Sequence, residues 1–186
     1  AESFALQGAK VLFITGPARF YPSHKNIDVI SVGTAEEMYN AVIVNFKHVN
    51  IAVMAAAVAD FTPMTVSTSK IKRESDDISI KLKPTKDIAA SLGKVKSKNQ
   101  FLVGFALETD KEFDNAVKKI ESKNLDLVVL NSLNDQGAGF GSDTNKVTII
   151  KKNRKIISFE LKSKTEVAND IVDCIAEEFD RLRVKG

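Results

Sequence analysis

Small residues, one carboxylate and several cations follow a short apolar run in this sequence. The apolar residues 51–54 lead into the small residues 55–59, Asp60 comes next, and Lys70 and the cations at 72–73 lie in a polar segment. In open α/β sheets, ligands bind at the carboxyl ends of strands, where small residues let a ligand approach the backbone. This pattern predicts a site for a phosphorylated ligand with a basic lid. A turn residue and a solvated loop are the simpler interpretations.

Three further kinds of residue could contact a ligand, although each has a simpler interpretation. Lys119 and Lys123 are four residues apart near the end of a predicted helix, where lysines commonly just favour the helix dipole. Phe105 follows a glycine at the end of a predicted strand, so its ring is either core or a surface for a flat base. Asn131 follows an apolar run, at the sheet edge where ligands collect.

The sequence contains no pair of residues that predicts a nucleophile and its general base. His24 and His48 have no Cys or carboxylate at metal-ligand spacing. The glycine-rich residues 137–141 look like a dinucleotide fingerprint, but they precede a predicted strand instead of a helix. Scattered lysines suit a reaction that activates a carboxylate with a nucleotide and then transfers the acyl group to an amine. Positioning and cations can drive both steps.

The composition is that of one globular domain. The chain has 186 residues, 44% hydrophobic and 27% charged, which is enough for one core. Its net charge of +3 comes from interspersed acids and bases, which suits anionic small molecules at least as well as nucleic acid. Because there is no spanning apolar run, no secretory signal and only one cysteine, we expect a cytoplasmic protein without membrane contact.

Short apolar runs alternate with helical patterns along the chain. Strands are expected at 10–14, 28–32, 51–54, 101–106, 125–130, 147–150 and 156–161, with a hairpin turn at 152–154. Helices are expected to start at the capping residues Thr34, Thr85 and Ser163, and over 110–123 with Phe113, Ala116, Val117 and Ile120 on the inner face. Residues 63–83 are expected to form a flexible flap that is partly β ribbon. The order predicts an α/β, Rossmann-like fold, with a mostly parallel sheet flanked by helices and a C-terminal β-hairpin.

The first residues do not match the usual start of such a fold. Residues 1–7 are typical of the end of a helix, whereas a doubly wound sheet begins with a strand and a turn. We therefore expect residues 1–186 to be a single domain that lacks its N-terminal strand and glycine-rich turn. Because phosphates usually bind at that turn, part of the site would lie outside this sequence.

Several motifs follow one another in an order and spacing that resemble one enzyme family. They are Met54-Ala-Ala-Ala-Val-Ala-Asp-Phe61, Ser69-Lys-Ile-Lys-Arg73, Pro84-Thr-Lys-Asp-Ile88, Val103-Gly-Phe-Ala-Leu-Glu-Thr109, residues 119–126, Asn131 and Gly139-Phe-Gly141. Together they resemble the bacterial phosphopantothenoylcysteine synthetases (phosphopantothenate–cysteine ligases) over nearly the whole chain. In many bacteria this domain is the C-terminal half of a bifunctional coenzyme A biosynthesis flavoprotein.

The resemblance implies a CTP-dependent ligation. 4′-Phosphopantothenate would attack the α-phosphate of CTP, and the amine of L-cysteine would displace CMP from the acyl-cytidylate, with Mg²⁺ accompanying the triphosphate. The implied nucleotide-binding residues are Met54, Ala55, Ala56, Asp60, Lys70, Lys86, Asp87, Ile88, Ala89, Phe105, Lys119 and Lys123, and the implied catalytic residues are Lys70 and Asn131. The resemblance also implies a homodimer, or a higher oligomer where a flavin-dependent decarboxylase domain is fused. No flavin is expected on this segment.

Two other function classes remain open at this point. A nicotinamide-dependent oxidoreductase could use the same fold class, although residues 28–32 are not followed by the acidic residue that would bind the ribose. A nucleic-acid-binding protein would need a basic surface with interleaved aromatic residues, which the mixed charges of this chain do not favour.

Overall fold

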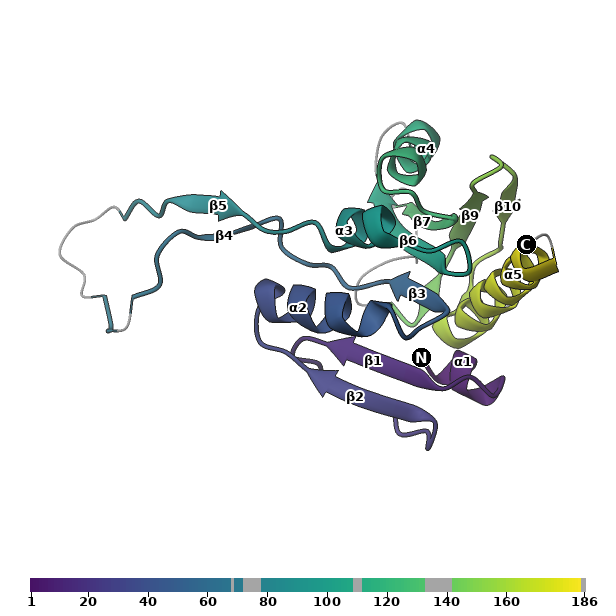
Figure 1. Ribbon diagram of the computed structural model, residues 1–186, viewed down its shortest axis with the longest axis horizontal. Helices are drawn as coiled ribbons and strands as arrows, with labels where there is room; N and C mark the ends of the chain where they lie inside the picture. The colour runs from purple at the N-terminus through teal and green to yellow at the C-terminus, as the bar shows by residue number, and fades with distance from the viewer. Residues whose placement is uncertain (68, 72–77, 109–111, 133–141, 185–186) are drawn as a thin grey trace.

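The computed structural model describes residues 1–67, 69–71, 78–108, 112–132 and 142–184 (Figure 1). The helices are α1 (Glu2–Leu6), α2 (Ala35–Phe46), α3 (Ile88–Val95), α4 (Glu112–Ser122) and α5 (Lys164–Val184). The strands are β1 (Val11–Thr15), β2 (Ile27–Ser31), β3 (Ile51–Met54), β4 (Phe61–Pro63), β5 (Leu82–Pro84), β6 (Phe101–Glu108), β7 (Leu127–Ser132), β8 (Thr144–Asn145), β9 (Val147–Lys151), β10 (Ile156–Ser158) and β11 (Lys162–Ser163).

The larger strands form two separate groups in the described part of the chain. The main sheet has the order β10-β9-β7-β6-β3, in which β3, β6 and β7 are parallel and β9 and β10 are antiparallel. β1 and β2 form a parallel pair of their own that is not hydrogen-bonded to β3. The predicted mostly parallel α/β sheet and the C-terminal hairpin β9–β10 are therefore confirmed. The break between β1 and β3 was not predicted.

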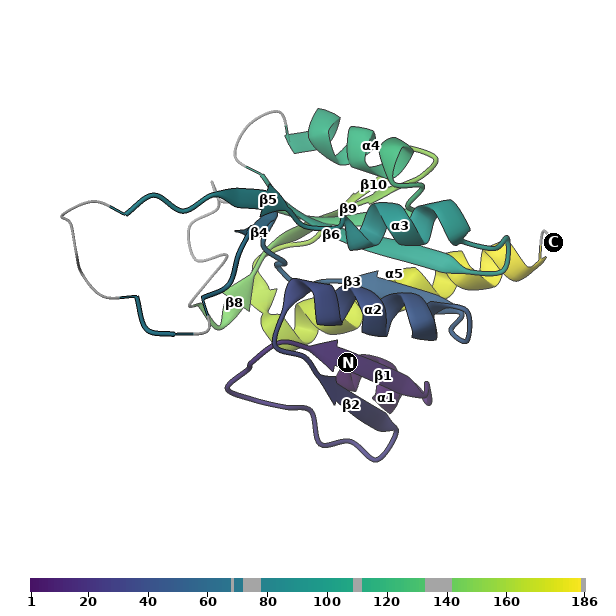
Figure 2. The same cartoon turned by 60° about the vertical axis from the view of Figure 1, so that its left-hand side comes forward.

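Helices cover both faces of the main sheet (Figure 2). Helices α2, α3 and α4 pack on one face, around the buried side chains of Leu92, Leu102 and Ile120. Helices α1 and α5 pack on the other, around Val103 and Ile175. Because both faces are covered, β6 and β7 are apolar at almost every position instead of alternating, as expected for a buried parallel sheet.

Two of the predicted helix starts are confirmed as capping boxes. At α2 the hydroxyl of Thr34 accepts from the Glu37 N–H, and the Glu37 carboxylate accepts from the Thr34 N–H. Ser163 and Glu166 make the same exchange at α5. The inner face predicted for α4 is wrong at Phe113, whose ring is 40% exposed because it lies at the start of the helix, beyond the edge of the core.

The described residues of the polar segment extend away from the body of the molecule, and among them only the base is a β ribbon (Figure 1). β4 pairs antiparallel with β5, which places Phe61 opposite Pro84. Ile78 and Ile80 alternate like strand residues, but they belong to no strand and are more than half exposed. Alternation stabilises a strand only where a neighbouring surface buries one face, and none does so here. The predicted flexibility of this flap stays a prediction.

Candidate functional site

A pocket of about 190 Å³ opens beside the carboxyl ends of β3 and β5 and the end of α4. It gathers four segments that are far apart in the sequence, at residues 54–60, 85–89, 104–105 and 119–128. The predicted site residues among its walls are Met54, Ala56, Asp60, Lys86, Asp87, Ile88, Ala89, Phe105, Lys119 and Lys123. Most of the residues predicted from the sequence are therefore neighbours in space.

The register of the parallel strands explains why two of these segments meet. Met54 at the end of β3 pairs with Gly104 of β6, so the chain leaves β3 beside Phe105. A Cβ atom at Gly104 would lie 2.7 Å from Cδ1 of Leu125. The glycine before Phe105 therefore leaves room for the Leu125 side chain, which would have to shift to admit a larger residue.

Thr85 holds the loop after β3 against the segment that leads into α3. Its N–H donates to the carbonyl of Asp60 at 2.9 Å, and its hydroxyl donates to the carbonyl of Ala59 at 2.7 Å. The prediction that Thr85 caps α3 is wrong, because its hydroxyl is used in this bridge. Asp87 is the N-cap instead, and its Oδ1 accepts from the Ala90 N–H at 2.9 Å.

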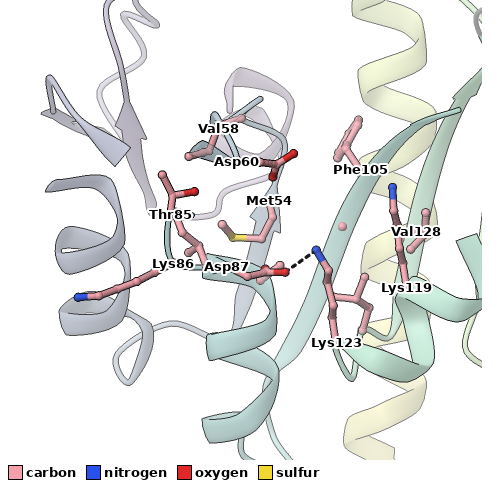
Figure 3. Close-up of a pocket in the computed structure, with 15 residues that line it drawn as sticks. Met54, Val58, Asp60, Thr85, Lys86, Asp87, Phe105, Lys119, Lys123 and Val128 are labelled. Carbon is pink, nitrogen blue, oxygen red and sulfur yellow. Dashed lines mark ion pairs between the residues drawn. The ribbon is translucent and has the colours of Figure 1, made fainter. Parts of the chain in front are cut away.

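An ion pair joins the start of α3 to the end of α4 across the pocket (Figure 3). Nζ of Lys123 lies 2.9 Å from Oδ2 of Asp87. Partial burial acts to raise the pKa of the Asp87 carboxyl, but the hydrogen bonds from the Ala90 N–H and from Lys123 outweigh it. The net pKa is lowered from the ordinary 3.8, so Asp87 is ionised at neutral pH.

Close backbone packing fixes the distance between these two helices. Cβ of an alanine at Gly93 would lie 1.9 Å from the carbonyl oxygen of Lys123, so only glycine fits. The side-chain amide of Asn124 donates to the Gly93 carbonyl at 2.9 Å, with the Asn124 backbone at a φ of 49°. Asn is among the residues that tolerate this left-handed conformation best. The end of α4 is thereby held against α3.

The three lysines of the pocket point in different directions (Figure 3). Lys123 extends from the end of α4 towards Asp87 on the opposite wall, whereas Lys119 lies on the side of the pocket that carries Phe105 and Val128. Lys86 points the other way, and its Nζ lies 3.7 Å from the Glu36 carboxylate and 4.6 Å from the centre of the Tyr39 ring. Lys86 therefore contributes its backbone and the apolar part of its side chain to the pocket wall, whereas its ammonium group interacts with α2.

Three predicted residues are not part of this pocket. Ala55 lines a neighbouring groove between β1 and β3. Lys70 is exposed in the segment that extends from the body. Asn131 lies within β7, which continues one residue further, and its Oδ1 is 3.4 Å from the amide nitrogen of Asn145. The cations at 72–73 and the glycines at 137–141 lie outside the described residues.

The sequence interpretation did not include some of the residues that line the pocket. Val58, Leu125 and Val128 contribute apolar surface. Nothing in their residue types distinguishes them from core residues, so only the knowledge that β3, β6 and β7 are neighbours could have identified them. Thr85 could have been found from its place directly after a strand and before a helix cap.

The chain matches the family described as the DNA/pantothenate metabolism flavoprotein C-terminal domain, over residues 1–179. It belongs to this family. The match includes every segment that forms the pocket. The family resemblance expected from the sequence is therefore confirmed, as is the fold class.

Named relatives of this chain are longer proteins. A protein named cysteine/cysteine sulfinic acid decarboxylase, from an unspecified prokaryote, is 56% identical over 172 residues, which are 92% of this chain and 48% of that protein. The coenzyme A biosynthesis bifunctional protein CoaBC of Bacillus subtilis is 41% identical over 95% of this chain and 43% of that protein. This flavoprotein C-terminal domain thus spans about half the length of the relatives it matches.

Solved structures of the family have the same architecture. The C-terminal domain of a CoaBC protein superposes with a TM-score of 0.78 at 34% identity, over 95% of this chain and 80% of that one. The DNA/pantothenate metabolism flavoprotein from Streptococcus pneumoniae has a TM-score of 0.80 at 20% identity, over 95% of this chain and 85% of that one. The second likeness shows the fold alone.

The described residues show neither a candidate metal cluster nor a candidate membrane span. They contain no cluster of three or more His, Cys, Asp or Glu side chains that could hold a metal ion. Among the helices that the structure describes, none has the length and apolar character to cross a bilayer.

Proposed function

We propose that this domain ligates 4′-phosphopantothenate to L-cysteine in coenzyme A biosynthesis, with CTP as the activating nucleotide. Membership of the family and the CoaBC names of its relatives support the reaction class. The observation that carries the proposal is the pocket itself. It gathers, from four separate segments, most of the residues that the resemblance assigns to the nucleotide.

The proposed reaction has two balanced steps. A carboxylate oxygen of phosphopantothenate bonds to the α-phosphorus of CTP, and the bond to the leaving oxygen breaks to release pyrophosphate. The cysteine amine then bonds to the acyl carbon, CMP leaves with the electron pair of the C–O bond, and the amine loses a proton to solvent. Both steps build negative charge on phosphate oxygens, which fixed cations stabilise.

The pocket residues suit these steps in distinct ways. Lys119 and Lys123 both line the pocket and would bind phosphate oxygens. A phosphate would compete with Asp87 for Lys123, because that ammonium is already paired. Phe105 offers a flat apolar surface on which a base could lie. Lys70 would have to approach by movement of the flap.

Mg²⁺ belongs to the proposal only as a companion of the triphosphate. The carboxylates in the pocket wall are Asp60 and Asp87, and Asp87 is already paired with Lys123. One or two carboxylates together with substrate phosphates is a common Mg²⁺ environment, so Asp60 is the residue that fits this ion. The homodimer, the cytoplasmic location and the absence of flavin on this segment are likewise proposals that rest on the family resemblance.

Nucleotide binding can be tested on the domain as it stands. Calorimetric titration should detect CTP, with ATP weaker and NAD⁺ without effect. Lys119→Met and Lys123→Met should each weaken CTP binding by about tenfold or more, because a hydrogen bond to a charged group contributes about 1.5–3 kcal/mol. Lys118→Met is the matched control, because Lys118 is exposed on the same helix and does not line the pocket. Binding of NAD⁺ in preference to CTP, or an equal loss in the control, would contradict the proposal.

Ligation is tested separately by pyrophosphate release and by the mass of the product. With phosphopantothenate, cysteine and each nucleotide in turn, CTP should give the fastest release, and Lys70→Ala should lose most of it. Equal release by wild type and Lys70→Ala would remove the flap lysine from the mechanism.

The decarboxylase name of one relative does not lead to a second proposal. This chain covers only 48% of that protein, and the CoaBC relatives with similar coverage carry a bifunctional name. Both names agree with the proposal if decarboxylation belongs to the part of those proteins that this chain does not span.

A further inference from the structure

Asn124 lies just beyond the end of α4, and its backbone closes that helix. The N–H of Leu125 donates to the carbonyl of Ile120 at 3.0 Å, and the N–H of Asn124 donates to the carbonyl of Glu121 at 3.4 Å. Together with the φ of 49° at Asn124, these two bonds form a Schellman motif. Glycine is the residue that most often occupies this position, because it has no Cβ to strain. The helix end alone therefore gives no reason for an asparagine.

The side-chain amide of Asn124 gives such a reason, because both of its ends have a partner. Its NH₂ group donates to the carbonyl of Gly93 in α3 at 2.9 Å. Its oxygen accepts from Nζ of Lys152 at 2.9 Å. Both contacts together need a group with a donor and an acceptor, and an ionised carboxylate has no donor. Glycine would lose both contacts.

The turn between β9 and β10 contacts the same helix end from outside the pocket. The N–H of Lys152 donates to the carbonyl of Asp126 at 2.9 Å, which fixes the turn beside Asn124. The Arg154 guanidinium also lies 3.1 Å from the Glu121 carboxylate, but this ion pair is exposed and contributes little. Asn124 is thus the residue at which α3, α4 and this turn meet.

Lys123 directly precedes Asn124, and both its backbone and its side chain contact α3. Its carbonyl oxygen packs against Gly93, and its Nζ lies 2.9 Å from Oδ2 of Asp87 (Figure 3). Asp87 is the N-cap of α3, and Gly93 lies near the other end of that helix. The bond from Asn124 to Gly93 therefore helps to fix the position of the Lys123 ammonium relative to α3 and its N-cap.

We propose that Asn124 is a positioning residue for nucleotide binding. Its amide, oriented by Lys152, holds the end of α4 against α3 and so directs the Lys123 ammonium into the pocket. The inference rests on the proposed function, in which Lys123 binds phosphate oxygens of CTP. Because a small misplacement of a binding group removes much of its effect, loss of the amide should weaken CTP binding even where the fold is retained.

The Asn124→Gly variant separates positioning from stability. Glycine adopts the left-handed backbone without strain, which offsets the loss of the two side-chain hydrogen bonds. The midpoint of thermal unfolding should stay within about 3 °C of wild type. Calorimetric titration should nevertheless show CTP binding weakened by roughly fivefold. Asn99→Gly is the matched control and should leave CTP affinity unchanged, because Asn99 is exposed in the turn before β6 and does not line the pocket.

A double-mutant cycle tests whether Asn124 acts through Lys123. In the Lys123→Met background, Asn124→Gly should change CTP affinity by less than about twofold, because the group that it positions is already absent. An equal loss in both backgrounds would overturn the proposal. Asn124→Asp keeps an acceptor for Lys152 but places an oxygen against the Gly93 carbonyl. It should therefore weaken CTP binding at least as much as Asn124→Gly, and wild-type affinity in this variant would also overturn the proposal.

A measurement without nucleotide distinguishes failure of this inference from failure of the proposed function. Partial burial raises the pKa of the Asp87 carboxyl, and the bonds from the Ala90 N–H and from Lys123 lower it by more. Withdrawal of Lys123 should therefore raise this pKa in Asn124→Gly, as it should in Lys123→Met. NMR titration of the side-chain carboxyl carbons measures it. An unchanged pKa in Asn124→Gly would overturn the inference even if CTP binds, whereas a raised pKa in a protein whose wild type does not bind CTP would refute only the proposed function.

Discussion

Replacing Gly93 with alanine tests whether the close packing of α3 on α4 builds the pocket. The new Cβ would lie 1.9 Å from the carbonyl oxygen and 2.7 Å from the carbonyl carbon of Lys123, where ordinary contacts are 3.4–4 Å. Both atoms belong to the backbone, so no side-chain rotation relieves the overlap. The two helices would have to move apart, which would also strain the hydrogen bond from Asn124 to the Gly93 carbonyl.

Two opposing contributions set the size of the effect. Alanine is favoured over glycine inside a helix by about 1 kcal/mol. Overpacking a well-packed site costs about 1–3 kcal/mol, and we expect the upper end because backbone must move. Gly93→Ala should therefore lower the free energy of unfolding by roughly 1–2 kcal/mol. Nucleotide binding should weaken as well, because the start of α3 and the end of α4 carry Asp87 and Lys123.

Urea unfolding followed by circular dichroism measures this loss. Gly16→Ala is the matched control, because a Cβ atom there would meet no atom within 4 Å and its φ is not positive. The control should stay within about 0.5 kcal/mol of wild type. If Gly93→Ala were as stable as wild type, helix propensity would outweigh the overlap, and the inference that glycine fixes the spacing of α3 and α4 would be refuted.

Three further predictions concern charged and buried groups. Asp87→Ala should destabilise the fold by about 1 kcal/mol more than Asp87→Asn in urea unfolding at pH 7, because asparagine is as good an N-cap as aspartate. The folded state lowers the pKa of Asp87, so the charge of this residue stabilises the fold above pH 3.8. That stabilisation should disappear as the pH falls through the pKa of Asp87 in the folded state. The difference in unfolding free energy between wild type and Asp87→Asn should then close. Glu178→Ala should lower the free energy of unfolding by roughly 3 kcal/mol in the same assay at pH 7. The Lys151 side chain is only 3% exposed, and the substitution removes the carboxylate that lies 2.9 Å from its ammonium. Glu178→Gln should lower the free energy of unfolding by less. Burial raises the pKa of the Cys174 thiol, so a thiol reagent at pH 8 should modify it far more slowly in the folded protein than in urea, and equal rates would contradict its burial.

Local signals in the sequence were sufficient for most elements of the fold. The capping boxes at Thr34 and Ser163 fixed two helix starts, because they depend only on residues three positions apart. The apolar run in β7 predicted a strand buried on both faces. The cap of α3 was assigned wrongly because Thr85 and Asp87 are both good N-caps, and the choice depends on a bridge from Thr85 to Ala59. No local pattern contains that contact.

The candidate site was predictable in part, from the order of the sequence motifs instead of from local patterns. Lysines on α4 look ordinary by themselves, and it was the ordered set of motifs that set Lys119 and Lys123 apart from Lys118. Pairing between Asp87 and Lys123 could not be predicted, because it depends on how closely α3 approaches α4. The direction of the Lys86 side chain could not be predicted either, because its partners Glu36 and Tyr39 lie about fifty residues earlier in the chain.

The small residues after β3 have two roles that the sequence could not separate. The run 55–59 was interpreted as a surface for close approach of a ligand. In the structure Ala55 faces the groove, whereas Ala56 borders both the groove and the pocket. A larger side chain at Ala56 would therefore narrow both the pocket and the groove. Because this short segment forms the boundary of both spaces, a change that widens or fills the groove would also alter the shape of the pocket.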